Sequence, residues 1–396
     1  MNISERLANV NESATLAMSQ KSRELQEQGH DVINLSIGQP DFNTPDHIKE
    51  AAKKAIDDNF SKYTPVPGLP AIREAVCTKF KRDNDLFFKP SQVVVSNGAK
   101  QSIANIILSL VGPGDEVIIP APYWVSYIEI VNLAQASNVI IEAGLDQDFK
   151  ITPAQLEAAI TPRTKVFLFS SPSNPTGSLY TKDELRALAD VFAKHPHVVV
   201  ISDEIYELIT FEGKHESIAQ FEEIKDRVVI VNGVSKGYAM TGWRIGYIAA
   251  PQWIADACIK LQGQYTSGAC AVSQVASAAA LTQTQVPSLE MKEVFLRRRD
   301  LVVKMAREIK GMKVNVPQGA FYLFPEVDNY FGKSADGYTI NNSTDLAMYL
   351  LEKAHVATVS GEAFGSPKCL RFSYATSDEQ LVEAMKRIKV ALEKLN

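Results

Sequence analysis

Short apolar runs separated by amphipathic stretches dominate the middle of the chain. The runs are continuous and rich in Val and Ile, as is typical of strands that are covered on both faces. They occupy residues 93–97, 116–120, 138–142, 165–169, 197–201 and 227–231. Helical patterns lie between them, for example at residues 181–195, where Thr181 and Glu184 have the spacing of a capping box. This alternation predicts an α/β fold with a mostly parallel sheet.

The pattern changes after about residue 285. A charged amphipathic stretch at 289–310 predicts a long helix, and two weaker strands, at 319–324 and 369–375, precede a final helix. Residues 13–29 predict another helix, and a Pro-rich turn near residue 45 separates this first segment from the next helical stretch. We therefore predict a large domain over residues 46–285 and a smaller α+β domain formed by residues 1–45 and 286–396.

Composition excludes several classes of function. The chain has 396 residues, 45% of them apolar, which is ample for a large core. A net charge of −5 disfavours binding to nucleic acids and to anionic membranes. The four cysteines lie far apart without C-x-x-C spacing, so we expect neither a metal site nor a disulfide framework, and we expect a cytoplasmic location. We also expect no signal peptide and no membrane span.

The residues that follow the apolar runs are candidates for binding and catalysis. In open α/β sheets, ligands bind beyond the carboxyl ends of the strands. Five of these ends carry polar, aromatic or glycine residues: Gly98, Ala99 and Lys100; Pro122, Tyr123 and Trp124; Ser173 and Asn174; Asp203 and Tyr206; Ser235 and Lys236.

Two of these residues suggest a chemistry. Partial desolvation at a strand end makes a lysine such as Lys236 available as an amine nucleophile, which can form a Schiff base with an aldehyde. The alternative for Lys236 is a surface lysine whose stem lies along apolar surface. Asp203 directly follows the most apolar run, where a carboxylate needs a cation or hydrogen-bond donors, and the pyridinium nitrogen of pyridoxal phosphate is such a cation. The alternative for Asp203 is a helix N-cap.

Three motifs together resemble the class I pyridoxal-phosphate-dependent aminotransferases, which have the aspartate aminotransferase fold. They are SSPSNPTG at 170–177, SDEIYELI at 202–209 and GVSKGYAMTGWRIGY at 233–247. In the last, five residues separate Lys236 from Gly242, and Arg244 follows at the family's spacing. The resemblance runs over essentially the whole chain, and it implies the fold type I of pyridoxal-phosphate-dependent transferases.

The resemblance implies a role for each candidate around the cofactor. Lys236 would bind pyridoxal phosphate covalently and carry a proton, and Asp203 would pair with the ring nitrogen. Tyr206 and Asn174 would hydrogen-bond the phenolic oxygen, while Trp124 would stack on the ring. Further cofactor contacts would come from Ser235, Arg244, and the backbone amides of Ala99 and Lys100 at a helix N-terminus.

Two further positions bear on the phosphate. Tyr63 resembles the family tyrosine that reaches the phosphate of the neighbouring subunit, which implies a homodimer with shared sites. Many relatives have a serine three residues before the lysine, whereas this chain has Gly233. We therefore expect no side-chain contact to the phosphate from that position.

The resemblance also implies an amino-acid substrate. Arg371 would bind the α-carboxylate, which Gly38 would border together with Trp124 and Asn174; without the resemblance, Arg371 would be interpreted as the exposed face of an alternating strand. One branch of the family supplies an arginine for the second carboxylate, but residues 264–274 contain none. Another branch uses a lysine and a Ser-x-Thr, and this chain has Lys100, Ser13 and Thr15.

We therefore predict transfer of the amino group of L-aspartate to 2-oxoglutarate. Prephenate, aromatic amino acids and alanine remain alternative substrates, and a carbon–sulfur β-lyase would use the same Lys236 and Asp203. A non-enzymatic ligand sensor is disfavoured, because such proteins carry a DNA-binding domain ahead of this fold and here the fold begins within the first few dozen residues. A Rossmann dehydrogenase is disfavoured because no G-x-G-x-x-G follows a strand.

Overall fold

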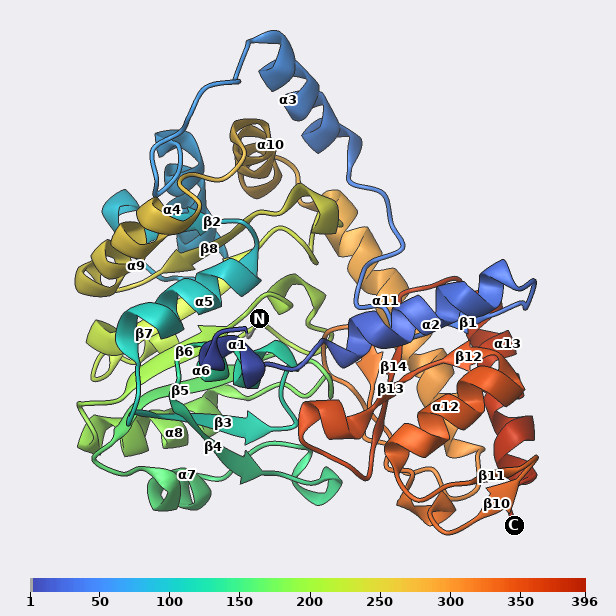
Figure 1. The fold of residues 1–396 in the computed structure, drawn as a ribbon. Coiled ribbons are helices and arrows are strands. Elements are labelled where there is room, and N and C mark those ends of the chain that lie inside the picture. The colour runs from blue at the N-terminus through green and yellow to red at the C-terminus, as the bar shows by residue number, and fades with distance from the viewer. Residues whose placement is uncertain (1–2) are drawn as a thin grey trace.

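The structure is a computed structural model that describes residues 3–396, and a seven-stranded sheet forms the middle of its larger part (Figure 1). The strands are β2 (Val93–Ser96), β3 (Glu116–Ala121), β4 (Ser137–Glu142), β5 (Thr164–Ser170), β6 (Val199–Asp203), β7 (Val228–Gly233) and β8 (Gly246–Ala249). Their order in the sheet is β2-β8-β7-β6-β5-β3-β4. Only β8 runs antiparallel to its neighbours, so the prediction of a mostly parallel α/β sheet is confirmed.

Helices cover both faces of this sheet, and successive side chains of a strand point alternately to one face and the other. In β5, for example, Phe167 joins the core on one face, whereas Val166 and Leu168 join the core on the other. Each fully buried side chain of this size contributes about 1.5–3 kcal/mol relative to exposure. This two-sided burial explains why the runs are continuously apolar.

One face packs against α4 (Pro70–Asn84), α7 (Pro153–Ala159) and α8 (Lys182–Lys194), while α10 (Ala271–Thr282) packs on α4 and α3 (Asp46–Asp57) packs on α10. The other face packs against α5 (Ala99–Leu110), α6 (Ser126–Leu133) and α9 (Gln252–Tyr265), and α1 (Glu5–Ala8) contacts α6. At the start of α8, the Thr181 hydroxyl accepts from the Glu184 amide at 3.3 Å and the Glu184 carboxylate accepts from the Thr181 amide at 2.7 Å. The predicted capping box is confirmed.

Two features of the sheet differ from the sequence-based prediction. Strand β4 forms the edge of the sheet, and most of its side chains are exposed or half-buried. The prediction that this run is covered on both faces is therefore wrong. Strand β8 was not among the predicted strands, although its four residues lie in the apolar run around Arg244.

The C-terminal part packs around a separate core (Figure 1). Its helices are α11 (Val286–Arg307), α12 (Ser343–Ala354) and α13 (Asp378–Glu393), and its strands are β9 (Tyr322–Leu323), β10 (Ser334–Ala335), β11 (Tyr338–Thr339), β12 (Val356–Ala357), β13 (Val359–Ser360) and β14 (Leu370–Ser373). From the first segment, α2 (Ala14–Glu27) packs on β12 and β13, and β1 (Ile33–Asn34) pairs with β12. The predicted helices at 13–29 and 289–310 and the final helix are present.

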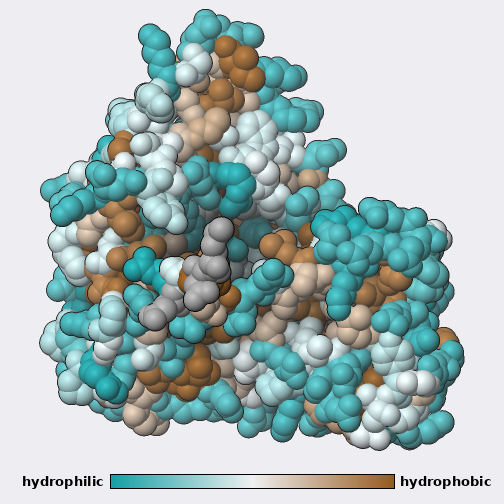
Figure 2. Space-filling view, in the orientation of Figure 1, coloured by the Kyte–Doolittle hydropathy of each residue, from teal (hydrophilic) through white to brown (hydrophobic). Residues whose placement is uncertain are grey.

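These cores are the basis for proposing the division into residues 46–285 and residues 1–45 with 286–396. Figure 2 shows the surface hollowed between the part that contains the sheet and the C-terminal part. Over the described residues 3–396, no helix is both long and apolar enough to cross a membrane.

Candidate functional site

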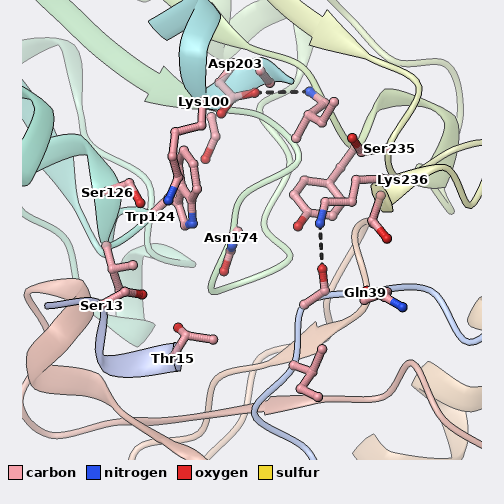
Figure 3. Close-up of a pocket in the computed structure, with 18 of the residues that line it drawn as sticks. Ser13, Thr15, Gln39, Lys100, Trp124, Ser126, Asn174, Asp203, Ser235 and Lys236 are labelled. Carbon is pink, nitrogen blue, oxygen red and sulfur yellow. Dashed lines mark hydrogen bonds between the residues drawn. The ribbon is translucent and has the colours of Figure 1, made fainter. Parts of the chain in front are cut away.

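A cavity of about 350 Å³ opens beyond the carboxyl ends of the parallel strands, where the sheet meets the C-terminal part (Figure 3). The predicted site residues that line it are Ser13, Thr15, Gly38, Ala99, Lys100, Trp124, Asn174, Asp203, Tyr206, Ser235, Lys236, Arg244 and Arg371. Tyr63 is the exception, since its side chain is 100% exposed and lies outside the cavity lining. The sequence thus identified part of the lining, whereas the role of each residue stays a prediction.

Lys236 follows β7 and enters the cavity partly buried. Its Nζ donates a hydrogen bond to the Gly38 carbonyl at 2.6 Å (Figure 3). Burial, together with the nearby charges of Arg371 and Arg244, lowers the pKa of Lys236 to about 8. The interpretation of Lys236 as a surface lysine is therefore wrong, and its amine is partly neutral near physiological pH.

Asp203 is the last residue of β6 and is 4% exposed. Burial raises the pKa of its carboxyl to about 6, although a hydrogen bond from Tyr127 opposes that shift. The Tyr127 hydroxyl donates to Oδ2 at 2.6 Å, and the Ile205 amide donates to Oδ1 at 3.3 Å. The interpretation as a helix N-cap is wrong, because a 3₁₀ turn at Glu207–Ile209 follows instead of an α-helix.

Arg371 lies on β14 with only 2% of its surface exposed, so its interpretation as the exposed face of a strand is wrong. Its guanidinium donates to Asn174 Oδ1 at 3.0 Å and to the Ser36 carbonyl at 2.5 Å, and it lies over the rings of Tyr322 and Phe364 at 4.6 and 5.0 Å. Its Nε has no hydrogen-bond partner within the part of the chain described. A buried guanidinium with a spare donor is suited to an anionic ligand.

A second cationic region lies at the N-terminus of α5. Arg244 donates to the carbonyls of Thr241 and Asn97, at 2.9 and 3.3 Å, so its guanidinium is held beside the first turn of that helix. Gly98 precedes the helix at φ +85°, and a side chain there would collide with the Arg244 guanidinium. Free helix amides beside an arginine, without intervening side chains, suit a phosphate group.

The wall opposite Lys236 carries Lys100 and Trp124 (Figure 3). Lys100 Nζ lies 5.1 Å from the centre of the Trp124 ring, and desolvation, followed by the charge of Arg244, lowers the pKa of this lysine. Ser13 and Thr15 approach the same side from the start of α2, and the Ser13 hydroxyl does not cap that helix. The Ser13 hydroxyl is therefore available to a ligand.

The charges of the cavity are unbalanced. Four cationic side chains line it, and in residues 3–396 none of them forms an ion pair with a carboxylate: Lys100, Lys236, Arg244 and Arg371. The buried acid of the cavity is Asp203, which bonds to Tyr127 and to a backbone amide. Such a cavity is suited to anions, and the donor set fits a phosphate, a carboxylate and an aldehyde-bearing ring with a protonated nitrogen.

Sequence reasoning missed several residues of the lining. Among them, Tyr127 hydrogen-bonds Asp203, and the Tyr322 hydroxyl lies 2.7 Å from that of Tyr206. No local pattern could have found either tyrosine, because each meets a partner that is distant in the sequence. The others are Leu16, Ser19, Ile37, Gln39, Val125, Ser126, Ser170, Ile205 and Thr241.

A buried acidic cluster lies next to Asp203 in the sequence. It contains Glu204, Glu207 and His215, whose ligand atoms all lie within 4.8 Å of one another. His215 Nε2 lies 3.1 Å from Glu204, and Lys79 forms an ion pair with Glu207. Although burial opposes it, the charge of Glu204 raises the pKa of His215. Lys79 and His215 thus offer these carboxylates partners from within the protein.

Comparisons with known proteins agree with this geometry. The family model "Aminotransferase class I and II" matches residues 30–388. An aspartate/prephenate aminotransferase of Cereibacter sphaeroides is 49% identical over 98% of both chains, and an aspartate aminotransferase of Geobacillus stearothermophilus is 46% identical over the same share of both.

Solved structures give the same result. The aspartate aminotransferase of Rhizobium meliloti has a TM-score of 0.97 at 42% identity and covers 100% of both chains. That of Thermus thermophilus with maleate has a TM-score of 0.93 at 38% identity and covers 99% of this chain and 100% of its own.

Proposed function

The chain belongs to the class I and II aminotransferases, and on that premise we propose that it moves the amino group of L-aspartate to 2-oxoglutarate, giving oxaloacetate and L-glutamate. The observation that carries this proposal is the set of four cations without carboxylate partners around one cavity. A phosphate-bearing cofactor and a dicarboxylic substrate together supply the anions that these side chains lack.

We propose pyridoxal phosphate as the cofactor. Arg244 and the amides at the start of α5 would hold its phosphate, Asp203 its ring nitrogen, and Trp124 its ring. Further contacts to the cofactor would come from Tyr206, Asn174 and Ser235. Lys236 would bind the cofactor covalently. When bound, the cofactor withdraws electrons from the substrate Cα, which makes the Cα proton acidic.

Lys236 would then act as the base. Its pKa of about 8 leaves part of the amine neutral near pH 7, so that it can take the proton from the substrate Cα and later return it. Arg371 and Asn174 orient the substrate, because the guanidinium offers a fork of donors to the α-carboxylate and is itself held by the Asn174 side chain at 3.0 Å.

We assign the second carboxylate of the substrate to Lys100, with Ser13 and Thr15 as additional donors. The Thermus relative was solved with maleate, a four-carbon dicarboxylate, which supports a substrate with two carboxylates. Prephenate is a second candidate substrate, favoured by the name of the Cereibacter relative and consistent with two carboxylates.

We further propose a homodimer with shared sites, in the cytoplasm. Tyr63 is fully exposed, and large apolar side chains nearby along the chain, Ile56 and Phe60, are 63% and 40% exposed, which supports an interface there. The four cysteines are free thiols, which supports a reducing compartment.

A panel of amino acids, added one at a time to the holoenzyme without a keto acid, tests the substrate assignment. We expect aspartate and glutamate to change the absorption spectrum of the cofactor fastest. Alanine should be slower by about 10–100-fold, because it lacks the carboxylate that accepts one charge-assisted hydrogen bond. Equal rates for aspartate and alanine would contradict the dicarboxylate assignment.

A further inference from the structure

Tyr127 is a fully buried tyrosine whose hydroxyl reaches the acid of the site. It is 1% exposed and lies in the first turn of α6, after Trp124. Its hydroxyl donates to Asp203 Oδ2 at 2.6 Å, across a sequence separation of 76 residues. This is a short contact from a neutral donor to a buried carboxylate.

The sheet order brings the two residues together. Strand β5 lies between β3, which leads into α6, and β6, which ends at Asp203. Ser170 and Asp203 are register partners at the ends of β5 and β6, so the Tyr127 side chain crosses the end of β5 to reach the carboxylate. The Trp124 ring packs edge-on against Tyr127 with centres 5.5 Å apart, which fixes the direction of the phenol.

Tyr127 provides the one side-chain hydrogen bond to the Asp203 carboxylate within residues 3–396. The second oxygen accepts from the Ile205 amide at 3.3 Å. Two charged groups act on the carboxylate: Glu204, which disfavours its ionised form, and Lys236, which favours it. Burial raises the pKa of Asp203 to about 6, and the Tyr127 hydrogen bond opposes this rise.

We propose that Tyr127 is a positioning residue that keeps the Asp203 carboxylate ionised and aimed at the ring nitrogen of the cofactor. This proposal rests on the proposed function for the cofactor, but its first step concerns two residues of this chain alone. The phenol occupies Oδ2, which leaves Oδ1 with one long backbone contact and free to meet a ring cation. Tyr127 thus acts through Asp203.

Tyr127→Phe removes the hydroxyl and keeps the ring. Tyr349→Phe is a matched control, because Tyr349 is also fully buried and its hydroxyl donates to the Ala391 carbonyl at 2.9 Å in the other core. In apoenzyme of the full chain, infrared difference spectra over pH 4–9 report the Asp203 carboxyl, which Asp203→Asn identifies. We expect Tyr127→Phe to raise its pKa by about one to two units, the equivalent of one charge-assisted hydrogen bond.

In the holoenzyme, we expect Tyr127→Phe to lower kcat by about 10–100-fold and to weaken cofactor affinity, with KM for aspartate changed less than about threefold. Tyr349→Phe should leave kcat, cofactor affinity and KM for aspartate unchanged. An Asp203 carboxyl that titrates as in the wild type, or equal losses in the control, would overturn the proposal. Should the wild type bind no cofactor, the proposed function fails, and the infrared titration still tests the Tyr127 contact.

A second variant keeps the fold and should shift the pKa of Asp203 in the opposite direction. Tyr127→3-fluorotyrosine has a more acidic phenol and therefore donates a stronger hydrogen bond to the carboxylate. We expect it to lower the pKa of Asp203 below that of the wild type. A shift in the same direction as Tyr127→Phe would also overturn the proposal.

Discussion

Replacing Arg371 by Met separates a ligand-binding role from a structural one. The side chain is 2% exposed, and its hydrogen bonds end on Asn174 and on the Ser36 carbonyl. In the ligand-free protein, its desolvation costs several kcal/mol, which these two bonds and two aromatic contacts offset. We therefore expect Arg371→Met to change the melting temperature of the ligand-free protein by no more than about 3 °C.

The same change should strongly reduce activity. A carboxylate bound by the guanidinium fork gains two charge-assisted hydrogen bonds of about 1.5–3 kcal/mol each, or about 3–6 kcal/mol together. At about 1.4 kcal/mol per factor of ten, kcat/KM should fall by about 10²–10⁴. The loss should be similar for aspartate, alanine and 2-oxoglutarate, since all three carry the carboxylate that we assign to Arg371.

Steady-state kinetics with the three substrates and a thermal melt of the ligand-free protein are the assays. Arg299→Met is the matched control, because Arg299 is 8% exposed and bonds the Pro317 carbonyl and Asp300 outside the cavity. We expect this control to keep wild-type kcat/KM. An Arg371→Met enzyme that keeps kcat/KM for aspartate within tenfold would refute the reasoning.

Three further predictions concern the rest of the site. Lys100→Met should lower kcat/KM for aspartate and 2-oxoglutarate by about 10–100-fold and for alanine by less than threefold, and equal losses would remove Lys100 from the second carboxylate. Because the pKa of Lys236 is lowered from 10.5 to about 8, cofactor binding to the apoenzyme should accelerate as pH rises, with a midpoint near 8; a midpoint near 10.5 would contradict this shift. The unfolded chain binds more protons between those values, so apoenzyme stability should rise with pH across that window. Tyr63→Phe should weaken cofactor affinity about tenfold while light scattering still reports a dimer, and unchanged affinity would mean that Tyr63 does not reach the phosphate.

Local sequence patterns were sufficient for most of the sheet and for placing polar residues at its strand ends. Asp203 ends β6 and Lys236 lies three residues after β7, so their positions at one edge of the sheet follow from the parallel topology alone. The exposed edge strand β4 could not be predicted, because strand order decides which strand lies at the edge and the apolar pattern does not encode that order.

The remaining differences come from contacts between distant parts of the chain. Tyr127 meets Asp203 across 76 residues, and Tyr322 meets Tyr206 across 116, so neither contact leaves a trace in a local pattern. Arg371 alternates with apolar neighbours, which is typical of a strand with one exposed face. Its strand, β14, is the middle of three, and Arg371 faces the cavity instead of solvent.

A covalent bond between Lys236 and the cofactor is the central claim. Borohydride reduction of the holoenzyme, followed by proteolysis and mass spectrometry, tests it most directly, because reduction makes an imine permanent at the lysine that formed it. We predict a single pyridoxyl-modified peptide containing Lys236. A modification on a different lysine, or an active enzyme with none, would contradict the account.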